Sequence, residues 1–356
     1  MEEHNFYSRQ TVLKEIGEIG QEKLKQSKFL IVGAGGLGHP VAIYLAAAGV
    51  GKISIIDFDR VEPSNLNRQI CFTREDIGKK KSEVLCDKLK TQNPFITVEG
   101  ITKKLQLQNI SKTINSFDII LDCSDNFNTK FLLHDFAWWH SKDLIQASIY
   151  QYEGQIQVFN YSKDKNTGCL RCLWNNKPEN HCVQNCSEAG VIGVVAGSLG
   201  TLQALESIKL LLDLGSKHNN TTIMVDLLNL ELQKIKWKKL DDCKLCSKKI
   251  SIQDVYGLHT PFYKDYELPD LNQPNMILVD IREKNEIVCD DTYDHYKIIY
   301  LPLSEIKSWK KEINPDKKYL FLCQKGIRSS QIVKEFRNQK LTNCFSLHGG
   351  IDRMKN

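Results

Sequence analysis

The chain has 356 residues, which at roughly 150 residues per domain predicts about two domains. Hydrophobic residues make up 41% and charged residues 26%, an ordinary globular mixture that excludes a disordered, collagen-like or membrane protein. The formal net charge of +5, from 48 basic and 43 acidic residues, is too balanced for a protein built mainly to bind nucleic acid.

Neither a secretory signal nor a membrane span is expected. Residues 1–10 have no apolar core behind a basic start. The longest uncharged run, residues 189–205, is too short and too rich in glycine for a bilayer span, and it is predicted as a buried loop and helix. A cytoplasmic location is therefore expected. Because that compartment is reducing, the 12 cysteines should bind metal, react or lie in the core.

The first half of the chain alternates between strand and helix patterns. Strands are predicted at residues 28–32, 52–56 and 117–121, an extended segment at 95–98, and helices at 40–48 and 82–90. Such alternation predicts a parallel sheet covered by helices.

Beyond this half, the elements change in character. The chain is predicted to hold a half-buried strand at 154–159, a polar loop at 175–185, a helix at 201–212 and a solvated edge strand at 234–239. Strands at 276–279 and 319–322 predict a second small α/β unit. We therefore predict domains at 1–246 and 275–356, joined by a polar, proline-containing linker at 247–274.

A glycine-rich loop lies between the first predicted strand and the first predicted helix. Its glycines are Gly33, Gly35, Gly36 and Gly38. Glycine allows a tight turn and close approach of the backbone to a phosphate, and a helix N-terminus favours an anion. Asp57 ends the next strand, where a ribose-binding carboxylate belongs. The loop predicts a nucleotide site without identifying the nucleotide, because NAD enzymes share the pattern.

Polar residues after the acidic strand end favour a triphosphate. They are Ser64, Asn65, Asn67 and Arg68, with Leu66 among them, followed by Lys81. A triphosphate needs several charge-assisted donors, whereas NAD does not need this cluster. Asp122, Asp125 and Asn126 lie at or just past the end of another strand, and a carboxylate near a triphosphate can hold magnesium.

Two C-x-x-C pairs predict a metal site. They are Cys169 with Cys172 and Cys243 with Cys246. Together they supply four thiolates for tetrahedral zinc, provided that the pairs meet across the fold. Four thiolates leave no open position, so no catalysis is expected at the metal. A thioredoxin-like redox pair is the rival interpretation, and two pairs in one cytosolic chain favour structural zinc.

Two further places predict cysteine chemistry. Cys182 and Cys186 lie in or beside the polar loop, where a cysteine facing a nucleotide site is a candidate nucleophile. Cys323 lies between a strand and a helix, where backbone N–H groups and the helix N-terminus favour a thiolate or a persulfide anion. Its loop to Arg328 is one residue shorter than that of tyrosine phosphatases, which favours sulfur chemistry over phosphate chemistry.

Together these residues resemble the ThiF/MoeB/HesA family, the bacterial relatives of ubiquitin-activating enzymes, with a rhodanese domain appended as in MoeZ-like and Uba-type sulfurtransferases. The resemblance rests on residues 7–10, 33–38, 57–59, 64–69, 81, 122–126, both C-x-x-C pairs, 186–190 and 200–206, and in the rhodanese part on 279–283, 323–330 and 348–351. It implies a Rossmann-like mixed-sheet adenylation domain with structural zinc, plus a small α/β rhodanese-like domain.

The resemblance also implies an activity. The enzyme would use ATP and Mg²⁺ to adenylate the C-terminal Gly-Gly carboxylate of a ubiquitin-like sulfur carrier protein. A rhodanese persulfide, charged by a cysteine desulfurase or another sulfur donor, would then give the carrier thiocarboxylate. Thiamine, molybdopterin, cysteine and tRNA thiolation pathways all use this layout. Neither nucleic acid nor a membrane is an expected partner.

Residue roles follow from the resemblance alone. It implies that ATP is bound by Gly36, Asp57, Asn65, Arg68 and Lys81, and that Asp125 with Asn126 completes the site. Arg9 would reach the phosphates of the partner subunit in a homodimer. Cys186 matches a loop cysteine that in some members forms an acyl-disulfide or thioester with the carrier, and Cys323 would carry the persulfide.

Two other functions stay open at this point. An NAD-dependent oxidoreductase could use the same glycine loop, and it would not need Arg9, Arg68 or Lys81. A non-catalytic zinc scaffold could recruit a sulfur carrier without adenylating it, although the complete set of phosphate-binding residues argues against this function.

Overall fold

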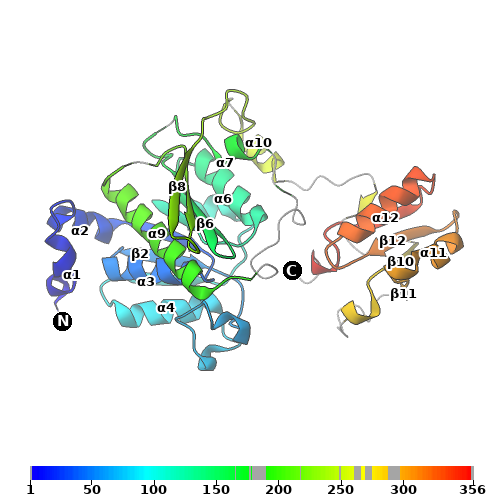
Figure 1. Cartoon of the computed structure of the whole chain (residues 1–356), viewed down its shortest axis with the longest axis horizontal. Helices are drawn as coiled ribbons and strands as arrows, with labels where there is room; N and C mark the ends of the chain where they lie inside the picture. Colours follow the sequence, from blue (N-terminus) through cyan, green and yellow to red (C-terminus); the bar gives the residue numbers. More distant parts are fainter. Residues whose placement is uncertain are drawn as a thin grey trace. The chain divides into compact units, whose positions relative to one another are not determined.

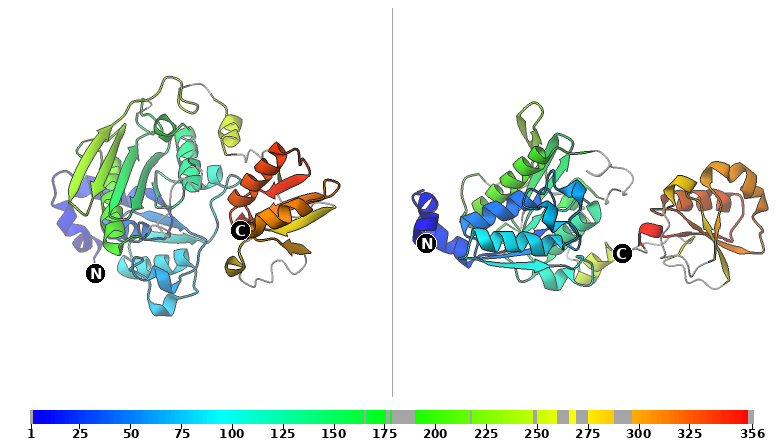
Figure 2. Two further views of the ribbon diagram at one scale, coloured as in Figure 1. Left: turned by 45° about the vertical axis from the view of Figure 1, so that its right-hand side comes forward. Right: turned by 90° about the horizontal axis from the view of Figure 1, so that it is seen from below.

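The computed structural model describes residues 2–353 except 165, 176–177, 179–189, 217, 248–249, 260–265, 269–274 and 288–296. The chain divides into two compact units, Met1–His259 and Thr260–Asn356. The first is built on an eight-stranded sheet and the second on a five-stranded sheet (Figures 1 and 2).

The sheet of the first unit is mixed. Its order is β3-β2-β1-β4-β5-β6-β7-β8, with β1 to β5 pairing in parallel and β5 to β8 antiparallel. The strands are β1 (Lys28–Val32), β2 (Lys52–Ile56), β3 (Thr97–Ile101), β4 (Ile119–Asp122), β5 (Asp143–Tyr150), β6 (Glu153–Phe159), β7 (Thr221–Asp226) and β8 (Glu231–Lys236). Strand and helix alternation predicts the parallel half, and the Rossmann-like mixed sheet implied by the resemblance is confirmed.

Helices cover both faces of this sheet. One face is covered by α2 (Gly17–Gln26), α3 (Gly38–Ala48), α4 (Lys81–Gln92) and α9 (Gly193–Leu212), and the other by α5 (Ile110–Ile114), α6 (Phe127–Trp139) and α10 (Ile252–Gly257). Along β1, Phe29 and Ile31 enter the core on the first face, whereas Leu30 and Val32 enter the core on the second. This period of two is what a strand buried on both sides requires.

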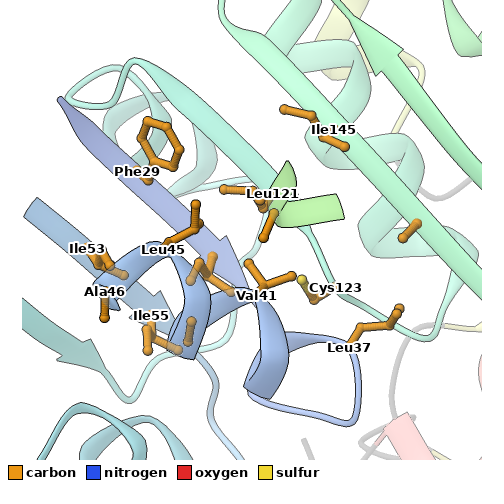
Figure 3. Packing of buried hydrophobic residues seen from close by; sticks show 14 of the residues in the cluster. Phe29, Leu37, Val41, Leu45, Ala46, Ile53, Ile55, Leu121, Cys123 and Ile145 are labelled. Atoms are coloured by element: carbon orange, nitrogen blue, oxygen red, sulfur yellow. The ribbon is translucent and has the colours of Figure 1, made fainter. Parts of the chain in front are cut away.

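Helix α3 is held by an apolar cluster on β1, β2 and β4. Its residues Val41, Leu45 and Ala46 lie against the side chains of these strands, among them Phe29, Ile53, Ile55 and Leu121 (Figure 3). Because α3 starts at the end of the glycine loop, this packing also sets the direction in which its N-terminus points.

Three elements extend or refine the sequence prediction. Helix α9 contains the helix predicted at 201–212 but begins at Gly193, inside the uncharged run. An exposed edge strand is present, since β8 is the last strand of the sheet and all six of its residues are exposed, but it spans Glu231–Lys236 and the predicted residues 237–239 lie beyond its end. Within the segment predicted as a linker, α10 packs against the first unit through the fully buried Val255.

The sheet of the second unit is entirely parallel, in the order β11-β10-β12-β13-β9. Its strands are β9 (Glu267–Leu268), β10 (Met276–Asp280), β11 (Ile298–Tyr300), β12 (Lys318–Leu322) and β13 (Cys344–Leu347), with helices α11 (Ile306–Trp309) and α12 (Ile327–Asn338). The two predicted strands are present as β10 and β12. Across the described parts of both units, no helix has the length and apolar character needed to cross a bilayer.

Replacement of Leu45 by alanine tests the core under the glycine loop. Leu45 is fully buried, so Leu45→Ala should lower the free energy of unfolding by about 2–5 kcal/mol through lost burial and a residual cavity. Hydrogen exchange of the β1 amides in the full chain measures this local loss. Tyr44→Ala on the same helix is the matched control, because Tyr44 is 54% exposed and its truncation should change stability by roughly 0.5 kcal/mol or less. Equal effects of the two variants would contradict this assignment of the core.

Candidate functional site

The glycine loop folds tightly between the ends of β1, β4 and α9. Gly33 has φ +103°, and a Cβ there would lie 2.7 Å from the carbonyl oxygen of Cys123. A Cβ on Gly38 would lie 2.0 Å from the oxygen of Gly33, and one on Gly36 would lie 3.0 Å from the Cβ of Ala196. Gly35 has open space around its Cβ position, so packing within the chain does not require glycine there. Three of the four predicted glycines thus lack room for a side chain.

Asp57 is tied to this loop at the end of β2. Its Oδ2 accepts from the backbone N–H of Ala34 (2.7 Å), and its Oδ1 accepts from the N–H of Asp59 (2.8 Å). Burial raises the pKa of Asp57, although these two hydrogen bonds and the charge of Lys81 oppose the rise. Lys81 is itself buried, and its Nζ lies 3.4 Å from Asp59 Oδ2. The structure therefore brings the glycine loop, Asp57 and Lys81 together, as the sequence predicts.

Arg68 reaches the same place from the segment after β2. Its Nη1 donates to the carbonyl oxygen of Ser64 (2.8 Å), and its Cγ lies 3.5 Å from the Cβ position of Gly36. Asn65 is buried and accepts from the backbone N–H of Glu62 (3.0 Å), so it shapes the turn from which Arg68 projects. Asn67 is exposed beside Arg68, and Leu66 is half-buried against the core.

The start of α9 packs closely against the segment that carries Arg68. A Cβ on Gly193 would lie 2.4 Å from the carbonyl oxygen of Asn67 and 3.2 Å from Cα of Arg68. Sequence reasoning missed this contact, because the predicted helix began at residue 201. The signal available was the run of small, uncharged residues before it.

The two acidic residues at the end of β4, Asp122 and Asp125, differ in burial. Asp122 is fully buried, and it accepts from Lys130 Nζ (3.2 Å) and Gln146 Nε2 (2.8 Å). These contacts make it a structural carboxylate inside the unit. Asp125 and Asn126 are exposed, and Asn126 caps α6 by accepting from the backbone N–H of Thr129 (2.9 Å). Asp125 is therefore the carboxylate at this strand end that a magnesium ion could reach.

His39 lies buried beneath the site and was missed by the sequence reasoning. Its Nδ1 accepts from the backbone N–H of Cys71 (3.1 Å), which places the proton on Nε2, and its ring packs edge-on against Phe72 at 4.4 Å. Nε2 is buried without a hydrogen-bond partner among the described residues. Burial, with the charge of Lys81, lowers the pKa of His39 to about 3, so the ring is neutral.

Two predicted residues lie elsewhere. Arg9 is exposed on α1 (Glu3–Thr11). That helix contacts the far end of α3, because Tyr7 lies 2.7 Å from the Cβ position of Gly49, whereas the glycine loop lies at the start of α3. Within one chain the structure therefore does not bring Arg9 to the loop. The predictions for Cys182 and Cys186 fall outside the described residues.

The two C-x-x-C pairs meet on the second face of the sheet, as the sequence predicts. The Sγ atoms of Cys169, Cys172, Cys243 and Cys246 lie within 4.8 Å of one another, and all four residues are buried. Cys169 and Cys243 are 3.4 Å apart, as are Cys172 and Cys246. In the first pair, Cys172 lies in the short helix α7 (Leu170–Leu173) and Cys169 is its N-cap residue. The four sulfurs could hold one metal ion.

A buried polar network lies behind the four cysteines. Arg171, between the first two cysteines, donates to Asp135 Oδ2 from Nε (2.9 Å) and Nη2 (2.7 Å). His259 Nε2 lies 2.7 Å from the same oxygen, and His134 Nδ1 lies 3.0 Å from Oδ1. Burial alone would raise the pKa of Asp135, but these hydrogen bonds and the charge of Arg171 lower it. The network therefore ties His259, just after α10, to Arg171 in the first cysteine pair.

The second unit has a separate site at the end of β12. The Cys323 Sγ is buried and lies 3.4 Å from both the backbone N and the Oγ of Ser329 on α12. Gly326 and Gly350 pack against each other, since a Cβ on Gly350 would lie 2.2 Å from the nitrogen of Gly326. The Cys323 loop and residues 348–351, which both carry the rhodanese resemblance, are thus adjacent in the structure.

Comparison with known proteins assigns both units. Residues 7–246 match the ThiF family and residues 267–356 match the rhodanese-like domain. The sulfur carrier protein adenylyltransferase of Thermus thermophilus is 38% identical over 69% of this chain and 91% of its own. The adenylyltransferase and sulfurtransferase MOCS3 of Drosophila yakuba is 34% identical over 98% of this chain and 82% of its own.

Two further similarities agree with this assignment. The probable molybdopterin-synthase adenylyltransferase of Porphyra purpurea is 33% identical over 100% of this chain and 94% of its own. Among solved structures, E. coli MccB with ATP superposes with a TM-score of 0.60 and 26% identity, over 68% of this chain and 74% of its own.

The buried His39 generates a pH prediction. An unfolded chain binds a proton at this histidine below about pH 6.5, whereas the folded chain excludes it down to about pH 3. Folding must then expel the proton, so stability should fall as the pH drops through this window, by about 1.4 kcal/mol per pH unit well below 6.5. Urea unfolding as a function of pH should show this slope reduced in His39→Asn.

Phe72→Leu serves as the control for His39→Asn. It loosens the packing around the ring without removing the titrating group. We expect it to lower stability at every pH and to keep the slope of the wild-type protein. Identical slopes in His39→Asn and wild type would contradict the buried neutral state of this histidine.

Proposed function

The chain belongs to the ThiF family, and on that premise we propose that it is an ATP-dependent adenylyltransferase for a ubiquitin-like sulfur carrier, joined to a rhodanese-like domain that supplies the sulfur. The observation that carries the proposal is the presence in one chain of two separate sites: the glycine loop with Asp57, Arg68 and Lys81, and the Cys323 loop. Relatives named as adenylyltransferases and as MOCS3 sulfurtransferases support it.

The glycine loop and its neighbours are proposed to bind ATP. The backbone of residues 33–38 and the start of α3 would receive phosphate oxygens, because peptide N–H groups and the helix dipole favour an anion there. Asp57 would accept from the ribose hydroxyls. Arg68 and Lys81 would meet the remaining phosphate charge, with Ser64 to Asn67 forming the turn that presents Arg68.

In the proposed reaction, the C-terminal Gly-Gly carboxylate of the carrier attacks the α-phosphorus of ATP. A carboxylate–phosphorus bond forms, the α–β phosphoanhydride bond breaks, and pyrophosphate leaves with the electron pair. Lys81 and Arg68 would stabilise the charge that develops on the leaving phosphates. Asp125, with Asn126 beside it, would hold the Mg²⁺ that shields this charge.

In this proposal, Arg9 acts at the ATP site of a second copy of the chain. It lies away from the glycine loop of its own chain, so it would complete the site of a partner subunit in a homodimer. Both the homodimer and the cytoplasmic location stay predictions of the sequence. Cys186 is the proposed residue for a covalent link to the carrier, as an acyl-disulfide or thioester.

Zinc fits the four-cysteine cluster. A tetrahedral ion with Zn–S bonds of about 2.3 Å separates its sulfurs by about 3.8 Å. The observed Sγ–Sγ distances of 3.4 and 3.8 Å are close to this value, and all four sulfurs are buried. Zinc bound here would join α7 to residues 243–246 as a structural cross-link, with no open position for a substrate.

Pyrophosphate exchange is the test of the adenylation proposal. With ATP and a Gly-Gly-ending carrier, the full-length protein should incorporate labelled pyrophosphate into ATP. Lys81→Met should lower this rate at least a hundredfold, because a cation facing the leaving phosphates contributes roughly 2.7–4 kcal/mol. Lys90→Met on the same helix, an exposed residue paired with Asp87, should keep the rate.

A second comparison separates the two activities. Cys323→Ala should retain pyrophosphate exchange and lose sulfur transfer to the carrier. No exchange with any Gly-Gly carrier, despite bound ATP, would refute the adenylation proposal.

Removal of one thiolate tests the metal site. We expect about one zinc per chain by elemental analysis, and Cys243→Ser should lose the metal together with several kcal/mol of stability, because structural zinc contributes folding free energy. Cys86→Ser, a buried cysteine on α4 away from the cluster, should keep the metal. Full zinc content in Cys243→Ser would contradict the site.

A further inference from the structure

Each of two arginines beside the Cys323 loop is held by a carboxylate. Arg282 donates to Asp280 Oδ2 from Nε (3.0 Å) and Nη2 (2.8 Å). Arg328 donates to Glu286 from Nη1 (2.8 Å, to Oε2) and from Nη2 (2.7 Å, to Oε1). Both guanidinium groups are therefore paired with a carboxylate, and Arg328 meets both oxygens of Glu286 in the bidentate geometry in which arginine binds a carboxylate or an oxyanion most strongly.

Of the two arginines, Arg328 is the one whose position allows it to meet an anion bound at Cys323. It is the second residue of α12, and the next residue, Ser329, directs its backbone N toward the Cys323 Sγ at 3.4 Å. Its side chain is 33% exposed, so solvent reaches it. A free guanidinium here, at a helix N-terminus beside a thiolate, would receive the oxyanion end of a small sulfur donor.

The guanidinium of Arg328 is already paired with Glu286. The Oε2 of Glu286 also accepts from the backbone N–H of Glu283 (2.9 Å), so the carboxylate is fixed from its own side of the pair. The hydrogen bonds from Arg328 lower the pKa of Glu286 to about 2, which keeps it ionised at neutral pH. An incoming oxyanion would have to displace a carboxylate that is already aligned and charged.

Resting on the proposed sulfur transfer, we propose that Glu286 is a donor-specificity residue: by occupying Arg328 it excludes free anionic sulfur donors such as thiosulfate, so that Cys323 takes sulfur from a cysteine persulfide on a partner protein. Glu286 is a positioning residue in this proposal, since it acts through Arg328 and does not touch the transferred sulfur.

The two donors differ in what their leaving groups need. With either donor, the Cys323 thiolate attacks the outer sulfur, a new S–S bond forms, and the old bond to that sulfur breaks. Thiosulfate releases sulfite, which carries two negative charges and needs a cationic partner as it forms. A protein persulfide releases a cysteine thiolate, which stays in the donor protein and takes its proton there. No net oxidation occurs in either transfer.

The experiment uses the full-length protein with two donors. Thiosulfate is one, with cyanide as acceptor and thiocyanate as the measured product. A cysteine desulfurase charged with L-cysteine is the other, with mass spectrometry of the Cys323 persulfide. Glu286→Gln keeps the shape of the side chain and removes its charge. It should raise kcat/KM for thiosulfate roughly tenfold or more, mainly through a lower KM, with loading from the desulfurase unchanged within about twofold.

Matched variants test whether the gain comes from Arg328. Glu335 lies on the same helix as Arg328, and Glu335→Gln breaks its exposed ion pair with Lys310 (3.2 Å), so this variant should leave both donors unaffected. Arg328→Gln added to Glu286→Gln should abolish the gain with thiosulfate. Glu286→Asp shortens the side chain, so it should give a smaller gain, and it replaces Glu286→Gln in the test if that variant does not fold.

The outcomes separate this inference from the proposal on which it rests. If wild-type Cys323 loads from the desulfurase but Glu286→Gln gains nothing with thiosulfate, the specificity role of Glu286 is wrong while sulfur transfer stands. A gain that survives removal of Arg328 would overturn it too. If wild-type Cys323 takes sulfur from neither donor, the proposed sulfur transfer fails, and the specificity role fails with it.

Discussion

The close approach of backbone to backbone at the glycine loop is the constraint on which the first site depends. Gly33 and Gly38 lie too near their neighbours for a side chain, and Gly36 meets the first turn of α9. The apolar cluster under α3 holds that helix against the sheet, so its N-terminus stays directed at the loop (Figure 3). Core packing therefore fixes the position of the glycine loop and of the helix N-terminus that we propose to receive the phosphates of ATP.

On the opposite face of the sheet, buried polar contacts fix the position of the cysteine cluster, as apolar packing fixes the position of α3. Asp135, fully buried on α6, holds Arg171 from the first cysteine pair and His259 from the end of the unit. The four cysteines and this network join segments that are far apart in sequence. Because removing one partner would leave a buried charge uncompensated, each member of the network depends on the others.

In the second unit, two ion pairs lie beside the loop that carries the buried Cys323. Backbone and hydroxyl groups of Ser329 approach Cys323, which suits an anionic sulfur, while Asp280 and Glu286 neutralise the adjacent arginines. The loop thus directs a backbone N–H at the sulfur, and two nearby arginines are each paired with a carboxylate. In the role that we propose for Glu286, this pairing favours sulfur from a protein over sulfur from a small oxyanion.

The sequence by itself determined the features that depend on local patterns: the alternation of strands and helices, the glycine loop after β1, the edge strand β8 and the two C-x-x-C pairs. Only the tertiary structure decided which distant groups meet. It buried Asp122 against Lys130 and Gln146, placed His39 under the loop, and paired Arg328 with Glu286, 42 residues away. It also extended α9 back to Gly193, where contact with Asn67 and Arg68 sets the start of the helix. Periodicity and spacing report which face of an element is buried, whereas the partner of a buried charge depends on how whole elements pack.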